Sequence, residues 1–353
     1  MFLAAGSPAL AQPDGPPAAQ VSAQRLAEFA WPHELVDIGG GRRLNLFCTG
    51  QGTHTVLLEA GGSDWSAIWG LVQPLLEGEA RVCSYDRAGL GYSDPALMPR
   101  SPNAIAGDLH ALIRAARLPT PLVLVGHSLG GFNVKLYAAL HPEDVAGMVL
   151  VDPAEERSTE RTHAWLVARM GRVGAARIEL GDIDFLRFLI ARYASCTATA
   201  RAAPLDPESL TYRRCTDPVR PRLGPAIAAE RRRLQVTEQY QAAQASEIAN
   251  SVYGSDEADA IYQALFSGHP FGDRPLIVLT HGEFDASDPA DAADHAAMVR
   301  LHRQSAALSR RGAQLVVPGS SHNIEIDAPA AIVAAVREVL RQLPARGPQA
   351  GRR

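Results

Sequence analysis

A short apolar run that leads straight into a glycine-flanked serine constrains this chain more than any other feature. The run Leu122–Gly126 opens into Gly126-His127-Ser128-Leu129-Gly130, and a helical pattern over Leu129–Leu140 begins at once. A serine on so sharp a turn would collide with side chains two residues before or after it, so both places need glycine. Strand, turn and helix in this order predict that Ser128 is a nucleophile at the carboxyl end of a sheet.

Short β-rich runs alternate with helical patterns along most of the chain. The strand-like runs are Glu34–Ile38, Arg43–Cys48, Thr55–Glu59, Arg81–Tyr85, Leu122–Gly126, Val145–Asp152, Leu276–Thr280 and Gln314–Val317. The helical patterns are Trp65–Leu76, Asn103–Ala116, Leu129–Leu140, Asp291–Arg311 and Ala328–Leu343. Continuously apolar strands suit a parallel sheet that is covered by helices on both faces. The alternation therefore predicts a doubly wound α/β fold with a mostly parallel sheet.

One long interval breaks this alternation. Between Asp152 and Leu276 no run indicates a parallel strand. The interval carries helical stretches instead, at Arg161–Val173, Ile183–Tyr193, Ala226–Asn250 and Glu257–Phe266. A compact domain rarely holds a structureless loop of this length, so we expect an inserted helical lid. We place the lid at residues 154–270, within a core made of residues 21–153 and 271–343.

The two ends have the composition of segments outside the core. Residues 1–20 combine a short apolar stretch and the small-x-small pattern Ala9-Leu10-Ala11 with a Pro/Gly-rich linker. No basic residue precedes Arg25, so we interpret the segment as a truncated signal peptide, with an Ala-rich disordered tail as the alternative. Residues 344–353 are expected to be a disordered tail. An exported protein, periplasmic or secreted, is the corresponding prediction.

Composition and charge exclude several classes of protein. Basic residues number 34 and acidic residues 38, which gives a net charge of −4. This balance carries no electrostatic signature of nucleic-acid binding. No apolar run reaches the roughly 18 residues that a membrane-spanning helix needs. With 46% hydrophobic residues the chain can bury a large core, which indicates a globular enzyme.

The motifs and their order resemble the α/β-hydrolase superfamily over nearly all of residues 34–343. The resemblance is carried by Leu57-Leu-Glu-Ala-Gly-Gly62, Tyr85-Asp-Arg-Ala-Gly-Leu-Gly-Tyr-Ser-Asp94, Gly126–Gly131 and Gly319-Ser-Ser-His322. The chain looks most similar to extracytoplasmic bacterial members that have a cysteine in strand two and another in strand four. This resemblance implies an eight-stranded α/β-hydrolase core with a helical lid. It leaves the substrate open, because the fold hosts many activities.

A serine hydroxyl needs a base to remove its proton, and the base needs a carboxylate to orient it. Our candidate base is His322, because it lies on the loop after the last strand, directly after a short turn. The resemblance implies the chain order serine, acid, histidine, and it points to Asp285 as the acid after the seventh strand. Asp152, at the end of the sixth strand, is an alternative. Other possible acids are Asp288, which could instead cap a helix, and Glu283.

Two backbone N–H groups are needed to bind the oxyanion of a tetrahedral intermediate. The N–H of Leu129, directly after the nucleophile, is the first candidate. The second is expected from the loop after the third strand, where many relatives carry His-Gly. Here the histidine is absent and Gly61-Gly62 remains, so Gly62 is the candidate, followed by Ser63. A simple strand-closing turn is the alternative interpretation of this segment.

Four cysteines are compatible with an oxidising compartment, although four buried thiols would also fit. The sheet order implied by the resemblance places strand two beside strand four, and so Cys48 beside Cys83. Cys196 and Cys215 flank a Pro-rich turn within the lid. We therefore expect the disulfides Cys48–Cys83 and Cys196–Cys215.

The resulting hypothesis is a serine hydrolase that transfers the acyl group of a small ester-like substrate to Ser128 and then to water. Relatives that open epoxides or remove halogens carry Asp at this position, so serine implies acyl transfer. No spacing motif for zinc or nucleotide phosphate is present, and we expect neither metal nor cofactor. An aminopeptidase (with Glu155, Glu156 or Glu160 as its amine site), a lactonase, a perhydrolase or a non-catalytic binding protein are the alternatives. The oligomeric state is left open.

Overall fold

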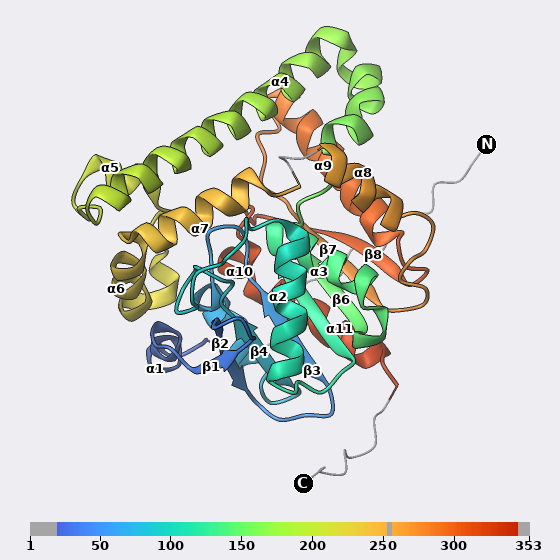
Figure 1. Ribbon diagram of the computed structural model, residues 1–353. Coiled ribbons are helices and arrows are strands. Elements are labelled where there is room, and N and C mark those ends of the chain that lie inside the picture. The colour runs from blue at the N-terminus through green and yellow to red at the C-terminus, as the bar shows by residue number, and fades with distance from the viewer. Residues whose placement is uncertain (1–19, 253–255, 345–353) are drawn as a thin grey trace.

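The computed structural model describes residues 20–252 and 256–344. The predicted ends, residues 1–20 and 344–353, lie almost wholly outside this range. Within it, eight strands form one sheet in the order β1-β2-β4-β3-β5-β6-β7-β8. The strands are β1 (Glu34–Asp37), β2 (Arg43–Thr49), β3 (Thr55–Glu59), β4 (Arg81–Tyr85), β5 (Leu122–His127), β6 (Val145–Val151), β7 (Leu276–His281) and β8 (Gly312–Val317). Figure 1 shows this sheet at the centre of the molecule, with helices around it.

All strands from β3 to β8 run parallel to one another, and only β2 is antiparallel to its neighbours, β1 and β4. The parallel strands are connected by crossovers, so the loops after β3, β5, β6, β7 and β8 all open at the same edge of the sheet. This edge is where the motifs singled out in the sequence meet. The predicted doubly wound α/β-hydrolase fold is confirmed.

The core consists of two apolar layers, one on each face of the sheet. Alternate residues of a strand face opposite sides, so Val56 and Leu58 belong to one layer and Leu57 to the other. The first layer is completed by α11 (Pro329–Gln342) and the segment around Trp65. The second is completed by α2 (Pro102–Ala115) and α3 (Leu129–Leu140). Because both faces are covered, the central strands are buried and mostly apolar.

In its described residues, the interval between β6 and β7 contains five α-helices. They are α4 (Ser158–Ala202), α5 (Leu210–Cys215), α6 (Gly224–Gln235), α7 (Glu238–Ala249) and α8 (Asp256–Leu265). Figure 1 shows α4 as a long arm that reaches from α9 (Pro289–Ala306) across to α5, with α7 running beneath it. The chain leaves β6 at the carboxyl edge of the sheet, and the inserted helices cover this edge before the chain enters β7.

Three helical segments differ from the sequence prediction. Residues Ser66–Leu71 and Gln73–Leu75 form two 3₁₀ turns in place of one helix over Trp65–Leu76. The predicted helices Arg161–Val173 and Ile183–Tyr193 both belong to α4, which is broken at Gly171 (φ 70°, ψ 168°) and not between the two predicted ranges. The pattern over Ala226–Asn250 divides at Thr237, whose side chain accepts a hydrogen bond from the N–H of Tyr240 and begins α7. An N-cap of this kind starts a new helix.

Both expected disulfides are present. Cys48 and Cys83 are direct partners in the antiparallel pair β2–β4, with Cα atoms 4.0 Å apart. Cys196 in α4 and Cys215 in α5 have Cα atoms 5.6 Å apart. The first disulfide therefore links strands of the core, and the second links two helices of the insertion. Of the described helices, none is both long and apolar enough to cross a membrane.

Candidate active site

Ser128 occupies a strained turn between β5 and α3. Its φ of 52° and ψ of −122° lie outside the regions that residues with a side chain normally adopt. A side chain at Gly126 would collide with the backbone of Gly130, and one at Gly130 would collide with the carbonyl of Ala60. The glycines are thus required, although the collisions would be with neighbouring backbone and not with Ser128, the contact expected from the sequence. The turn leaves Ser128 half-buried at the carboxyl edge of the sheet.

Asp152 is the carboxylate that contacts the candidate base. It directly follows β6, is buried, and has a positive φ of 45°. His322 follows β8, and its Nδ1 lies 2.5 Å from Oδ2 of Asp152, while its side chain is 49% exposed. With Nδ1 held by the carboxylate, the other ring nitrogen is left to face solvent or substrate. This is the geometry of a base oriented by an acid.

The structure does not bring Asp285 to His322. The Asp285 carboxylate is exposed and accepts hydrogen bonds from the N–H and the hydroxyl of Ser287, which lower the pKa of Asp285. Asp288 is the N-cap of α9, the alternative duty that its sequence context suggested. Glu283 is exposed. The loop after β7 folds its acidic side chains into local turns, so the contact expected for Asp285 is made from β6 by Asp152.

Asp152 has two further imidazole neighbours, which the sequence analysis missed. His281, at the end of β7, places its Nδ1 2.7 Å from the same oxygen Oδ2 and donates its backbone N–H to Oδ1 at 3.0 Å. Buried His302 lies 3.9 Å from Oδ1. Burial raises the pKa of Asp152, but hydrogen bonds from His281 and His322 outweigh burial and bring this pKa well below its usual range. Asp152 is therefore a firmly ionised carboxylate.

Within the described part of the chain, no hydrogen bond joins Ser128 Oγ and His322. Both residues nevertheless follow parallel strands of the same sheet, β5 and β8, at its carboxyl edge, and His127 links their loops. Buried His127 lies with Nε2 2.8 Å from the backbone oxygen of His322, and the two rings are 4.7 Å apart. Burial lowers the pKa of His127 to about 3, so its ring is neutral. Hydrogen bonds between catalytic groups are often long without substrate and shorten when it binds.

Two backbone donors adjoin Ser128 with no acceptor of their own. Among the described residues, neither the N–H of Leu129 nor that of Gly62 donates a hydrogen bond to the protein. A Cβ on Gly62 would lie 3.7 Å from the side chain of Leu129, so the two residues are neighbours. The N–H of Ser63 is instead bonded to Glu247 at 3.2 Å. Among the described residues, Gly62 is thus a free donor of this loop, whereas Ser63 is not.

A buried ion pair holds the loop after β3. Arg87 donates to the carbonyl of Ala60 at 2.5 Å and to that of Gly61 at 2.7 Å. Its guanidinium also binds both carboxylate oxygens of Glu247, in α7, at 2.6 and 2.8 Å. All of these groups are buried. The inserted helices are therefore connected through Glu247 and Arg87 to the backbone that precedes Gly62.

The chain belongs to the alpha/beta hydrolase fold family, which matches residues 54–329. Two curated relatives are matched over part of their length. YqjL of Bacillus subtilis is 31% identical over 125 residues, which is 35% of this chain and 49% of YqjL. The (lyso)-N-acylphosphatidylethanolamine lipase of Mus musculus is 34% identical over 90 residues, which is 24% of this chain and 26% of the lipase. The chain thus spans at most about half the length of these relatives.

Solved structures are similar over most of both chains. A thermophilic esterase from Thermogutta terrifontis superposes with a TM-score of 0.52 at 22% identity, covering 88% of this chain and 98% of the esterase. At this identity the likeness establishes the fold.

Proposed function

We propose that this chain is a serine hydrolase of carboxylic esters, and that Ser128, His322 and Asp152 form its catalytic triad. The observation that carries the proposal is the strained, glycine-flanked Ser128 beside two unpaired N–H groups, at the edge where Asp152 orients His322. A reactive serine, an oriented base and a preorganised oxyanion site are the three parts that acyl transfer requires.

In the proposed reaction, Ser128 Oγ attacks the ester carbonyl while His322 Nε2 takes the hydroxyl proton. The carbonyl oxygen becomes an oxyanion held by the N–H groups of Leu129 and Gly62. His322 then gives its proton to the departing alcohol, which leaves an acyl-enzyme on Ser128. Water, deprotonated by His322, attacks the acyl group, and collapse of the second intermediate releases the carboxylic acid and restores Ser128. Asp152 stays ionised throughout and stabilises the imidazolium.

Similarity to an esterase and a lipase supports the ester as the substrate class. An aminopeptidase has less support, because it needs a free acidic group for the substrate amine. Glu155 and Glu156 are buried and paired with Lys135 and Arg161. Glu160 forms an ion pair with Arg157. A lactonase or perhydrolase would use the same residues as the esterase.

We also propose that the protein is exported. The N-terminal pattern Ala9-Leu10-Ala11 supports this location, and so do two disulfides within one chain. Disulfides persist mainly in oxidising compartments.

The decisive experiment combines covalent labelling with a substrate panel. We expect a fluorophosphonate to label the wild-type protein at Ser128, as identified by peptide mass spectrometry, and not to label S128A. Hydrolysis of short p-nitrophenyl esters should fall by at least about a thousandfold in S128A. Lactones and aminoacyl amides in the same panel distinguish the alternative substrates. Labelling elsewhere, or equal turnover by S128A, would contradict the triad.

A further inference from the structure

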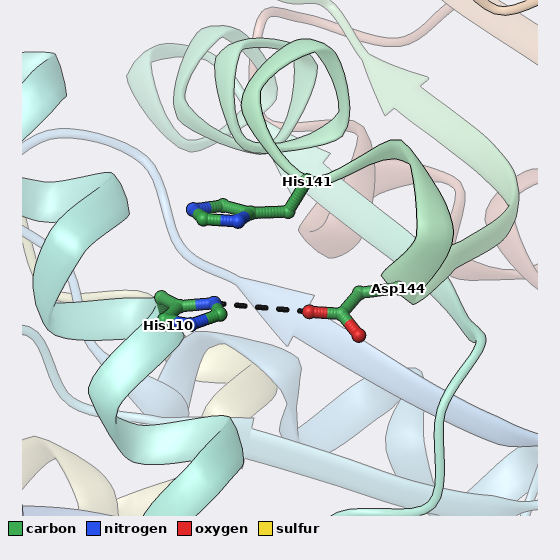
Figure 2. Close-up of side chains that lie close together, drawn as sticks. All are labelled: His110, His141 and Asp144. Atoms are coloured by element: carbon green, nitrogen blue, oxygen red, sulfur yellow. Dashed lines mark ion pairs between the residues drawn. The ribbon is translucent and has the colours of Figure 1, made fainter.

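A second group of imidazole and carboxylate side chains lies at the opposite edge of the sheet from Ser128. His110 belongs to α2, His141 directly follows α3, and Asp144 ends the 3₁₀ turn Pro142–Asp144 that leads into β6. Figure 2 shows the three side chains converging from these three elements. Because β6 begins at Val145, the cluster lies at the amino ends of the parallel strands. None of its members takes part in the proposed reaction.

The potential ligand atoms are close together. His110 Nδ1 lies 3.7 Å from Asp144 Oδ2, and the rings of His110 and His141 stack with centroids 4.0 Å apart and planes at 13° (Figure 2). One nitrogen or oxygen from each of the three residues lies within 4.8 Å of the other two. Two ligands of one tetrahedral Zn²⁺ are about 3.3–3.5 Å apart, given bonds of about 2.0–2.1 Å. Rotation of the side chains is therefore needed to bring these atoms to coordinating distances.

The carboxylate is held in place by a neighbour. Asp144 is buried, and Tyr137 donates its O–H to Asp144 Oδ2 at 2.8 Å. A hydrogen-bonded carboxylate is the usual outer-shell arrangement of a metal ligand. Within the described residues no lysine or arginine pairs with Asp144, and its one ion-pair partner is His110. The negative charge is thus available to a cation that approaches from the half-exposed side of His110.

We propose that His110, His141 and Asp144 bind one divalent transition-metal ion, with Zn²⁺ as the best-matched ion. Two imidazoles and one carboxylate are a ligand set that Zn²⁺ favours over the oxygen-preferring Mg²⁺ and Ca²⁺. Water would complete the coordination. The lone pair of an imidazole nitrogen lies in the plane of its ring. In two stacked rings these planes are parallel, so the lone pairs do not converge on one ion. Binding therefore requires the stack to open by rotation of a ring, and we expect the bound rings to be no longer parallel.

The position of the site indicates a structural role. Its ligands come from α2, from the end of α3 and from the turn before β6, so a bound ion would fasten two helices to the start of a central strand. The sequence shows no spacing motif because the ligands come from separate elements. An ion bound only to the folded chain raises its stability by mass action.

The test is a titration of the metal-free protein with ZnCl₂ by calorimetry, together with thermal unfolding. We expect H110A and D144N each to bind one Zn²⁺ fewer than the wild type, or to bind it at least tenfold more weakly, and to lose the rise in Tm that Zn²⁺ causes. H269A is the matched control, because His269 is an exposed histidine outside both clusters. It should bind as the wild type does.

A further variant separates this site from the histidines around Asp152. Asp152, His281 and His322 also lie within 4.8 Å of one another and could take up Zn²⁺. We expect H281N to keep the Zn²⁺ that H110A loses. His110 is partly exposed, so H110A should fold, and its Tm without metal serves as the check. Equal Zn²⁺ stoichiometry and affinity in the wild type, H110A and D144N would overturn the proposal, as would failure of the wild type to bind.

Discussion

At the scale of single residues, Asp152 is the central residue of the candidate site. It is a buried carboxylate whose two oxygens meet His322, His281 and, at longer range, His302. A buried charge is tolerated only where it is paired and hydrogen-bonded. These imidazoles stabilise the charge of Asp152, and Asp152 in turn orients His322, the candidate base, through Nδ1.

Exchange of each candidate acid for its amide distinguishes Asp152 from Asp285. In D152N the amide cannot stabilise an imidazolium at His322, so we expect kcat/KM for a p-nitrophenyl ester to fall by about 10³–10⁴-fold. D285N should change kcat/KM by less than about twofold, because the Asp285 carboxylate bonds only its own loop. Steady-state kinetics on both variants measure this, and the reverse ranking would restore Asp285 as the acid.

His281 should set the pH at which activity appears. Burial lowers the pKa of His281, but the hydrogen bond with Asp152 outweighs burial and raises this pKa, and His281 shares Oδ2 with His322. In H281N the second imidazole on Oδ2 is lost, so this oxygen stabilises the imidazolium of His322 more strongly. We expect the acidic limb of the kcat/KM profile to move to higher pH, with little change in its plateau. The control is H295N, because Nε2 of His295 contacts the backbone oxygen of His281. If the acidic limb of the profile stays at the same pH in H281N, the role of His281 is confined to packing.

At the scale of elements, the inserted helices and the sheet edge act as one unit. Glu247 of α7 binds Arg87 and the N–H of Ser63, and Arg87 binds the carbonyls just before Gly62. The lid therefore does more than cover the edge: one of its side chains fixes the backbone that carries a proposed oxyanion donor.

Weakening this link should lower the rate more than substrate binding. In E247Q the side chain keeps its shape but loses the charge that faces Arg87, so the loop before Gly62 is held less firmly. We expect kcat to fall by about ten- to a hundredfold, with KM changed less. E238Q, at an exposed site near the start of the same helix, is the control. A loss of thermal stability with unchanged kcat would show that the link serves folding alone.

At the scale of the whole molecule, buried carboxyl groups connect stability to pH. Glu325 is fully buried and forms no side-chain hydrogen bond in the described structure, and burial raises the pKa of Glu325 to about 8. The folded chain then keeps a proton that the unfolded chain loses above its ordinary carboxyl pKa. Folding stability contributed by this group is complete at low pH and is lost as pH rises towards 8.

Replacement of Glu325 by the neutral glutamine should remove this dependence. We expect E325Q and the wild type to have similar free energies of unfolding at pH 5. Above pH 8 the wild type should be less stable than E325Q by a few kcal/mol, since each pKa unit corresponds to about 1.4 kcal/mol. Urea unfolding at the two pH values measures the difference, with E338Q, a helix-surface variant, as the control. A constant difference between the proteins at both pH values would contradict the buried-acid assignment.

Local sequence was sufficient to predict features that depend on nearby residues. The apolar strands, the turn at Ser128 with its required glycines, and the helix after it follow from periodicity and steric exclusion. The strand order and the pairing of Cys48 with Cys83 also agreed with the resemblance to a known family. Helix breaks were harder to predict, because Gly171 and Thr237 interrupt patterns whose apolar spacing continues across them.

The partners of the candidate base were decided only by tertiary structure. Asp152 and Asp285 both follow a strand of the same sheet, and the prediction favoured Asp285 because local sequence does not show which carboxylate reaches His322. In the fold, Asp285 accepts hydrogen bonds from its own loop after β7, and Asp152 is the carboxylate that contacts His322. The contact of Glu247 with Arg87 and the meeting of His110 with Asp144 likewise join residues from separate elements. Such contacts depend on how elements pack, which local periodicity does not encode.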